Sequence, residues 1–188
     1  MIGYAFCGSF CTLRDSLSAL KELINLGFEI QPIMSEKVYS TDTRFFEAKE
    51  LIKEVEELCG RGIIHTIEKA EPLGPKTPLE ALIIAPCTGN TLAKLSAGIT
   101  DSSVTMAAKA HLRCDRPLLI ALSTNDAMSS NLSSIAKLLT RRQIYFVPLR
   151  QDDPTGKPYS LVADMKRLPE AFAAMGEEKQ LRPLFLEP

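Results

Sequence analysis

The chain has 188 residues, of which 45% are hydrophobic and 24% are charged, and its formal net charge is −1. This profile predicts one domain over residues 1–188 with a sizeable core. It excludes a basic surface for nucleic acid, and no apolar run is long enough to cross a membrane.

Strand-length apolar runs alternate with segments of helical periodicity, which predicts βαβ units around a parallel sheet. We expect the first strand at residues 2–6, a turn at 8–12, and a helix over 13–26 that ends at Gly27. The second strand is expected over residues 28–34. A polar loop over 35–44 and a helix over 45–59 follow it.

The second half of the chain continues this alternation. Residues 63–64 begin a short strand, and the prolines within 70–77 predict a loop. Residues 144–147 are expected to be the last strand, 152–159 a loop, and 162–174 the closing helix. The tail from about residue 176 to 188 is expected to be less ordered. Between these segments we expect strands at 81–85 and 117–122, and helices at 90–98, 104–112 and 130–140.

The most informative stretch is the central strand with the turn that follows it. The strand ends abruptly in four small polar residues that open a helix, namely Thr88, Gly89, Asn90 and Thr91. A helix N-terminus leaves several backbone N–H donors unpaired and carries the positive end of the helix dipole. This turn is therefore a suitable seat for a phosphate or another anion.

Three further strand ends are also rich in small polar groups. Any one such turn is more often a helix cap or a turn former. In an open parallel sheet, however, ligands bind outside the carboxyl ends of the strands. Four polar turns at successive strand ends therefore predict a shared pocket for a nucleotide-type cofactor. The other three turns contain Gly8, Ser9 and Cys11, then Ser35, and then Ser123, Thr124, Asn125 and Asp126.

Several common sites are disfavoured by missing motifs. The chain has no G-x-G-x-x-G fingerprint for NAD, no P-loop and no G-x-S-x-G elbow. Neither histidine has a catalytic partner at a suitable spacing, and His111 is expected to be a surface or packing residue. Cys87 and Cys11 are expected to be small buried fillers. The odd cysteine count and the lack of a signal peptide indicate reduced thiols in the cytoplasm, without a zinc site.

Loop cations form a candidate anion site beside the expected pocket. Arg44, Lys76 and Lys157 lie in loops near the strand ends, and Asn125 follows a strand. If the substrate is a carboxylate, such groups would hold it. The alternative is that they are ordinary solvated side chains. The adjacent carboxylates of residues 152–153 are expected to shape a turn, so no catalytic residue is assigned.

Some of these positions carry a family resemblance. Gly8-Ser9, Ser35 and the segment Pro86-x-Thr88-x-Asn90-Thr91-x-Ala93-Lys94 resemble the flavoprotein superfamily, which includes flavin-containing cysteine decarboxylases and flavin prenyltransferases. The resemblance implies a Rossmann-like three-layer α/β sandwich with a mostly parallel, doubly wound sheet. It also implies FMN as the cofactor and a trimer-based homo-oligomer. The implied FMN contacts are Gly8, Ser9, Cys11, Ser35, Thr88, Gly89, Asn90, Thr91, Ser123 and Thr124.

Longer loop segments resemble one branch of that superfamily, the dipicolinate synthase B subunits of spore-forming bacteria. These segments are residues 40–45, 69–76, 123–127 and 151–154. The resemblance implies oxidation of a dihydrodipicolinate-type precursor to a pyridine dicarboxylate during sporulation, in the cytoplasm of the mother cell. The implied partner is a nicotinamide-binding A subunit, through which alone NAD(P) takes part.

The chain departs from the other branches at two places. Residues 35–46 contain no histidine, and residues 123–126 lack the Pro-x-Met-Asn pattern of the cysteine decarboxylases. The arginine that flavin prenyltransferases carry near Thr124 is absent as well. A decarboxylase and a prenyltransferase therefore stay as the less favoured alternatives. A third alternative is a non-catalytic scaffold for the A subunit.

Overall fold

The structure, a computed structural model, describes residues 1–187. Its first half alternates strands and helices as the hydrophobic pattern predicts, with two short helices in addition, over residues 36–40 and 67–70. The short strand expected from residue 63 is a single bridge between Ile64 and Ile33. The elements are β1 (Ile2–Phe6), the 3-10 helix η1 (Phe10–Thr12), α1 (Leu13–Asn25), β2 (Ile30–Met34), α2 (Glu36–Ser40), α3 (Ala48–Cys59), α4 (Ile67–Ala70) and β3 (Leu82–Cys87).

The second half adds the other strands and the covering helices. Its elements are α5 (Gly89–Ala97), α6 (Ser103–Leu112), β4 (Leu118–Thr124), α7 (Leu132–Leu139), β5 (Ile144–Phe146), β6 (Leu149–Arg150), β7 (Leu161–Ala163), the 3-10 helix η2 (Met165–Arg167) and α8 (Leu168–Gly176). Within residues 1–187, no helix combines the length and the apolar character that crossing a bilayer requires.

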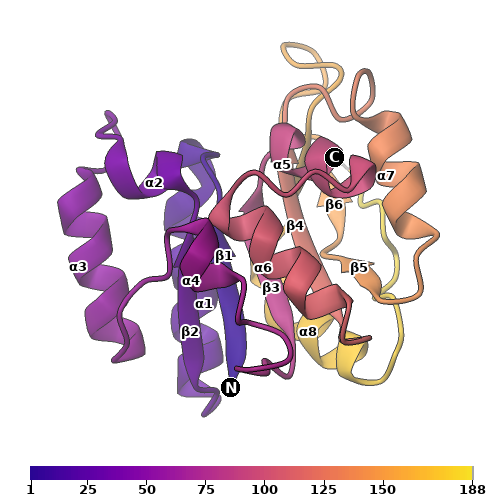
Figure 1. The fold of residues 1–188 in the computed structure, drawn as a ribbon. Helices are drawn as coiled ribbons and strands as arrows, with labels where there is room; N and C mark the ends of the chain where they lie inside the picture. The colour runs from indigo at the N-terminus through magenta and orange to yellow at the C-terminus, as the bar shows by residue number, and fades with distance from the viewer. Residues whose placement is uncertain (188) are drawn as a thin grey trace.

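The seven strands form one sheet with the order β2-β1-β3-β4-β7-β6, and β5 pairs with β4. The pairs among β1 to β5 are parallel, whereas β7 is antiparallel to both β4 and β6. In Figure 1, α5 and α6 lie in front of the sheet, and α1 and α8 lie behind it. The predicted three-layer sandwich with a mostly parallel, doubly wound sheet is therefore confirmed.

The topology places the usual ligand position of such sheets at one edge. Because β1 lies between β2 and β3, the winding of the chain changes direction between β1 and β3. Ligands of open parallel sheets bind at such a switch point, outside the carboxyl ends of the strands. A buried hydroxyl chain fixes α1 at this place. Tyr4 Oη donates to the carbonyl oxygen of Ser16 (2.9 Å), and Ser16 Oγ donates to the carbonyl oxygen of Ala85 in β3 (2.6 Å).

The prediction of a loop over residues 35–44 is wrong in part, because residues 36–40 form α2. The Ser35 hydroxyl caps this helix by accepting from the Val38 N–H (3.5 Å). The following helix begins at Ala48 rather than at residue 45. An Asp42 carboxylate oxygen accepts from the Ala48 N–H at 2.8 Å, so a polar turn precedes the first helical residue.

The end of the chain differs most from the expectation. Residues 144–147 are not the last strand, since β6 and β7 follow and form an antiparallel pair. The closing helix begins at Leu168 rather than at residue 162, because Val162 pairs with Ser123 inside the sheet. Pro169 lies in the first turn of α8, where its missing N–H leaves no hydrogen bond unmade.

The tail runs beside β6. The Leu149 N–H donates to the carbonyl oxygen of Leu184 (2.7 Å), and the Leu186 N–H donates to that of Leu149 (2.8 Å). These bonds attach residues 184–186 to the sheet. The tail that the sequence predicts to be less ordered includes Pro188, which lies outside the described residues.

Candidate functional site

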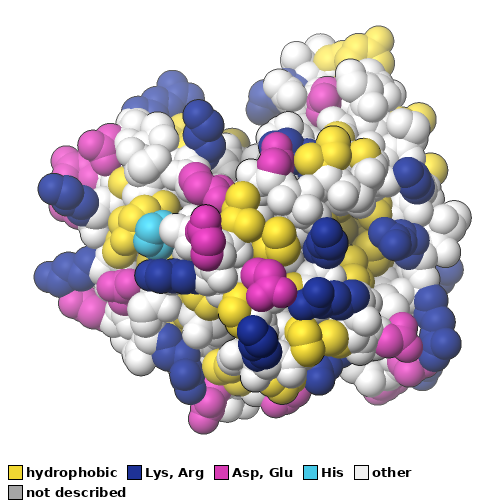
Figure 2. Space-filling model, in the orientation of Figure 1, with side chains coloured by type: hydrophobic (Ala, Val, Ile, Leu, Met, Phe, Trp, Pro, Cys, Tyr) yellow, Lys and Arg dark blue, Asp and Glu magenta, His cyan; other side chains and the backbone are white. Residues whose placement is uncertain are grey.

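Two adjoining clefts open at the carboxyl edge of the sheet. The β4 cleft, of about 730 Å³, is bounded by the turns after β1, β3 and β4 and by the loop between β6 and β7. The β2 cleft, of about 760 Å³, lies between the same β1 and β3 turns and α2. Gly8, Phe10, Thr88 and Asn90 line both clefts. Figure 2 shows the molecule hollowed at this edge, at the top of the view.

The turn between β3 and α5 presents hydrogen-bond donors to both clefts. Thr88 is the N-cap of α5, and its Oγ1 accepts from the Thr91 N–H (3.2 Å). The Thr88 hydroxyl donates to Thr91 Oγ1 (3.0 Å), which in turn donates to Cys7 Sγ (3.3 Å). The backbone N–H groups of Gly89 and Asn90 have no acceptor among residues 1–187. The first turn of α5 is therefore ready to bind an anion.

Gly89 is packed closely against a polar cluster from the end of β4. Thr124 Oγ1 donates to Asp126 Oδ1 (2.6 Å), and Asn131 Nδ2 donates to both oxygens of Asp126 (3.0 and 2.9 Å). A Cβ atom at Gly89 would lie 2.5 Å from Thr124 Oγ1 and 2.6 Å from Asn131 Nδ2. The absence of a side chain at Gly89 is therefore what allows α5 to approach the cluster.

A hydroxyl network joins the turn after β1 to the end of β4. Ser9 Oγ donates to Ser123 Oγ (2.9 Å), and Thr12 Oγ1 donates to Ser9 Oγ (3.1 Å). Cys11 is exposed at the wall of the β4 cleft, so its expected burial is wrong. The reason is that Cys11 lies within η1, whose turn leaves its side chain toward solvent and buries that of Thr12 instead.

Ser35 lies in the β2 cleft and not in the β4 cleft. The neighbouring Glu36 accepts from the Ser103 N–H at 2.8 Å, so a carboxylate already occupies the N-terminus of α6. The β2 cleft also contains the ion pair of Lys94 with Asp101, at 2.9 Å. Hydrogen bonding to Lys94 lowers the pKa of Asp101, so that carboxylate is ionised at neutral pH.

The cations that the sequence singles out are only partly brought together. Arg44, Lys157 and Asn125 all line the β4 cleft, and the Arg44 guanidinium lies 4.7 Å from the centre of the Phe45 ring. Lys157 Nζ is bound to an Asp152 carboxylate oxygen at 2.8 Å. A bound dianion would therefore meet both cations from the same cleft.

Lys76 is not brought to this edge. It lines neither cleft and lies in the loop that leads to the amino end of β3. In that loop, Gly74 is packed against Ala110 and Cys114 at the end of α6. Sequence proximity to β3 could not reveal this, because the loop between α4 and β3 crosses from one edge of the sheet to the other.

The buried thiols of Cys7 and Cys87 give no nucleophile here, and His111 gives no base. Burial raises the pKa of Cys7 to about 11 and that of Cys87 well above the ordinary thiol value, so both are protonated at neutral pH. Cys87 is a buried filler, as predicted. His65 stacks on Tyr39 with the ring centres 3.6 Å apart. His111 is fully buried and therefore a packing residue, one of the two roles expected for it.

Sequence reasoning missed several residues of the clefts. Phe10 lines both, and Glu36 lines the β2 cleft. Asn131 lines neither, but its amide donates to both carboxylate oxygens of Asp126, which lines the β4 cleft. Asp126 belongs to a polar turn that the sequence identifies, and its position directly after a strand is a local pattern from which its place at the cleft could be predicted. Asn131 gives no local signal, because its role depends on the contact with Gly89 from a different element.

The chain is similar to known proteins over most of its length. A family model described as Flavoprotein matches residues 1–167. The dipicolinate synthase B subunit of Bacillus subtilis (strain 168) is 44% identical over 186 residues, which covers 99% of this chain and 93% of that protein. A crystal structure of the dipicolinate synthase B subunit of Bacillus halodurans superposes with a TM-score of 0.91 at 41% identity, covering 99% of this chain and 95% of that chain.

A more distant structure shows how widely the fold is shared. An FMN-dependent cysteine decarboxylase superposes with a TM-score of 0.69 at 20% identity, covering 94% of this chain and 95% of that chain. At this level of identity the likeness concerns the fold alone.

Proposed function

Because the chain belongs to the Flavoprotein family, we propose that it binds FMN at the carboxyl edge of its sheet. We propose further that it takes part in oxidising a dihydrodipicolinate-type precursor to dipicolinic acid. The observation that carries the proposal is the meeting of four polar strand ends in two adjoining clefts at the β1/β3 switch point. The near full-length similarity to a dipicolinate synthase B subunit supports the choice of reaction.

The donor set fits a phosphate-bearing cofactor. The free N–H groups of Gly89 and Asn90 and the hydroxyl of Ser9 would hold the phosphate and the sugar-like chain of FMN. Thr88 orients the turn, and Gly8 leaves room for close approach of the ligand, since a Cβ there meets only the Phe10 ring, at 3.4 Å. Ser123 and Thr124 would face the flavin ring from the end of β4. Bound FMN supplies an acceptor for a hydride.

The residues of this chain would position the dicarboxylate. Arg44 and Lys157 supply two cations in the β4 cleft, and Asn125 supplies an amide at the same wall. A doubly charged substrate would displace Asp152 from Lys157, whose ion pair lies largely at the surface and is therefore weak. This charge pattern favours a flat dicarboxylate over a neutral molecule of the same size.

The partner would supply the nicotinamide. The chain has no dinucleotide fingerprint, and its B-subunit relative implies an A subunit. We place NAD(P) on that A subunit, and the step in the cytoplasm of the mother cell of a sporulating bacterium. A trimer-based homo-oligomer is proposed as well, since a relative of this fold is described as a dodecamer.

Reconstitution tests the proposed reaction. The chain, a purified A subunit, FMN, NAD(P) and a dihydrodipicolinate precursor are mixed, and dipicolinate formation is followed by its near-ultraviolet absorbance. We expect product only when both subunits and FMN are present. The same rate from the A subunit without this chain would contradict the proposal. Product in the absence of FMN would leave the chain as a scaffold for its partner.

The dicarboxylate site is tested by exchanging one cation. Lys157→Ala is expected to weaken binding of pyridine-2,6-dicarboxylate to the FMN-treated protein about tenfold, because one charge-assisted hydrogen bond is lost. Isothermal titration calorimetry measures this. Lys76→Ala is the matched control, since Lys76 lines neither cleft, and its affinity should equal that of the unchanged protein. Equal affinities for both variants would remove Lys157 from the site.

A further inference from the structure

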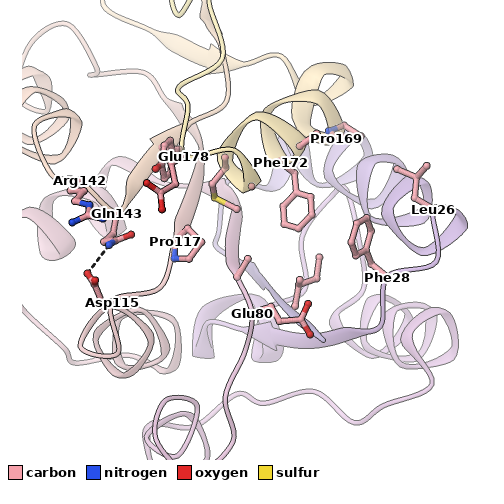
Figure 3. Close-up of a pocket in the computed structure, with 16 residues that line it drawn as sticks. Leu26, Phe28, Glu80, Asp115, Pro117, Arg142, Gln143, Pro169, Phe172 and Glu178 are labelled. Atoms are coloured by element: carbon pink, nitrogen blue, oxygen red, sulfur yellow. Dashed lines mark hydrogen bonds between the residues drawn. The ribbon is translucent and has the colours of Figure 1, made fainter.

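A third large cavity lies at the opposite edge of the molecule. It has a volume of about 760 Å³ and lies where β1, β3, β4 and β5 begin, with α8 as one wall. Figure 3 shows the aromatic side chains of Phe28 and Phe172 at one end, and Arg142, Asp115 and Glu178 at the other. Glu80, which pairs with the N-terminal ammonium group, lies near the aromatic end. None of the residues assigned above to the FMN or dicarboxylate sites lines this amino-edge pocket.

The apolar end of the amino-edge pocket is aromatic. Phe28 and Phe172 meet edge to face, with their ring centres 5.1 Å apart and their planes at 78°. Leu26 and Pro169 extend this surface, and Pro117 lies between it and the charged end. Leu26 is 62% exposed and Phe28 is 37% exposed, although both are large apolar residues. An apolar group of a ligand would remove this surface from water.

The polar end carries Arg142 and two carboxylates, Asp115 and Glu178. Asp115 accepts a hydrogen bond from Gln143, whereas among residues 1–187 neither Arg142 nor Glu178 makes a side-chain ion pair or hydrogen bond. Both act on Tyr145 between them. Burial raises the pKa of the Tyr145 hydroxyl, the Glu178 carboxylate raises it further, and the Arg142 guanidinium lowers it. Arg142, Tyr145 and Glu178 all line the pocket, and Figure 3 shows Arg142 and Glu178 at the same end, so the two opposite charges face a common space.

Two carboxylate residues at this end have a backbone conformation that favours glycine. Asp115 and Glu178 have φ angles of 57° and 58°, and they are the only non-glycine residues with positive φ among the described residues. Each follows the end of a helix, α6 or α8, where glycine is the usual residue. Helix ends also carry partial negative charge, which favours a bound cation. The pocket thus has a strongly negative side and, at Arg142, one positive group.

We propose that the amino-edge pocket binds a small zwitterion with an apolar side chain, that is, a free α-amino acid such as phenylalanine or leucine. Its carboxylate binds the Arg142 guanidinium, and its ammonium group binds Glu178 at the end of α8. Its side chain packs against Phe28 and Phe172. The site is separate from the proposed FMN and dicarboxylate sites and does not depend on them.

Calorimetric titration of the full chain with L-phenylalanine tests the proposal. Phenethylamine and 3-phenylpropanoate are the matched probes, because each keeps the ring and only one of the two charges. We expect saturable binding of L-phenylalanine and affinities at least about tenfold lower for both probes. Equal affinity for either probe, or no binding of L-phenylalanine and L-leucine, would overturn the proposal.

Two variants link the binding to the named residues. Arg142→Gln and Glu178→Gly are each expected to weaken L-phenylalanine binding about tenfold or more. Glycine adopts a positive φ without strain, so Glu178→Gly should melt at the same or a higher temperature than the unchanged chain. Its loss of binding therefore cannot arise from unfolding. Unchanged binding in both variants would show that the charged end does not recognise the ligand, and would refute the proposal whatever the outcome of an FMN titration.

Discussion

Gly89→Ala is expected to weaken FMN binding about a hundredfold, which corresponds to about 3 kcal/mol of binding free energy. The added Cβ would lie 2.5 Å from Thr124 Oγ1 and 2.8 Å from Asp126 Oδ1. These atoms are held by hydrogen bonds to one another and to Asn131, so they cannot move apart without breaking the cluster. The first turn of α5 must shift instead, and its N–H groups leave their positions at the two clefts.

The measurement is a fluorescence titration with FMN, together with thermal unfolding of the same sample. Gly176→Ala is the matched control, because an added Cβ there meets nothing within 4 Å. That variant should bind FMN as the unchanged chain does, and it should be as stable or slightly more stable. Normal FMN affinity in Gly89→Ala would show that the close approach of α5 to the cluster has no role in binding.

His111 is expected to make the stability of the fold depend on pH. Its ring is fully buried, and its Nε2 lies 2.8 Å from the carbonyl oxygen of Pro117, so Nε2 carries the proton of the neutral ring. Its Nδ1 is buried without a partner among the described residues. Protonation would place a charge there, and burial accordingly lowers the pKa of His111 to about 4.

The direction of the effect follows from the lowered pKa. Because the folded value is about 4 and the ordinary value is 6.5, the unfolded chain binds the proton more readily between these pH values. The contribution of neutral His111 to the free energy of unfolding is complete above about pH 6.5. It falls by about 3 kcal/mol as the pH decreases to about 4. Urea unfolding at a series of pH values measures it. The same slope in His111→Gln would show that other groups cause it.

The candidate site could be predicted to the extent that it is built from local patterns. A buried strand, a polar turn and a helix are neighbours in sequence, so Thr88 and Asn90 could be placed at a helix N-terminus before the fold was known. The order of alternating strands and helices then places the turns after β1 and β3 at one edge. Neither step needs long-range information.

The missed features depend on contacts between distant elements. Strands β6 and β7 have two and three residues, too few for a periodic signal, and β7 exists because Val162 pairs with Ser123. The position of Lys76 depends on the path of its loop along α6, and the role of Asn131 depends on Gly89. The amino-edge pocket could not be predicted from local patterns either, because residues from both ends of the chain form its walls.

The central claim, that the carboxyl edge binds FMN, is tested most directly by titrating the purified chain with FMN and following flavin fluorescence and absorbance. The double variant Thr88→Ala/Thr91→Ala removes the cap of α5 and the hydroxyl between Thr88 and Cys7. We predict saturable binding near one FMN per chain, which the double variant loses although it stays folded. No binding to the unchanged chain at cellular flavin concentrations, or equal binding to the double variant, would contradict the claim.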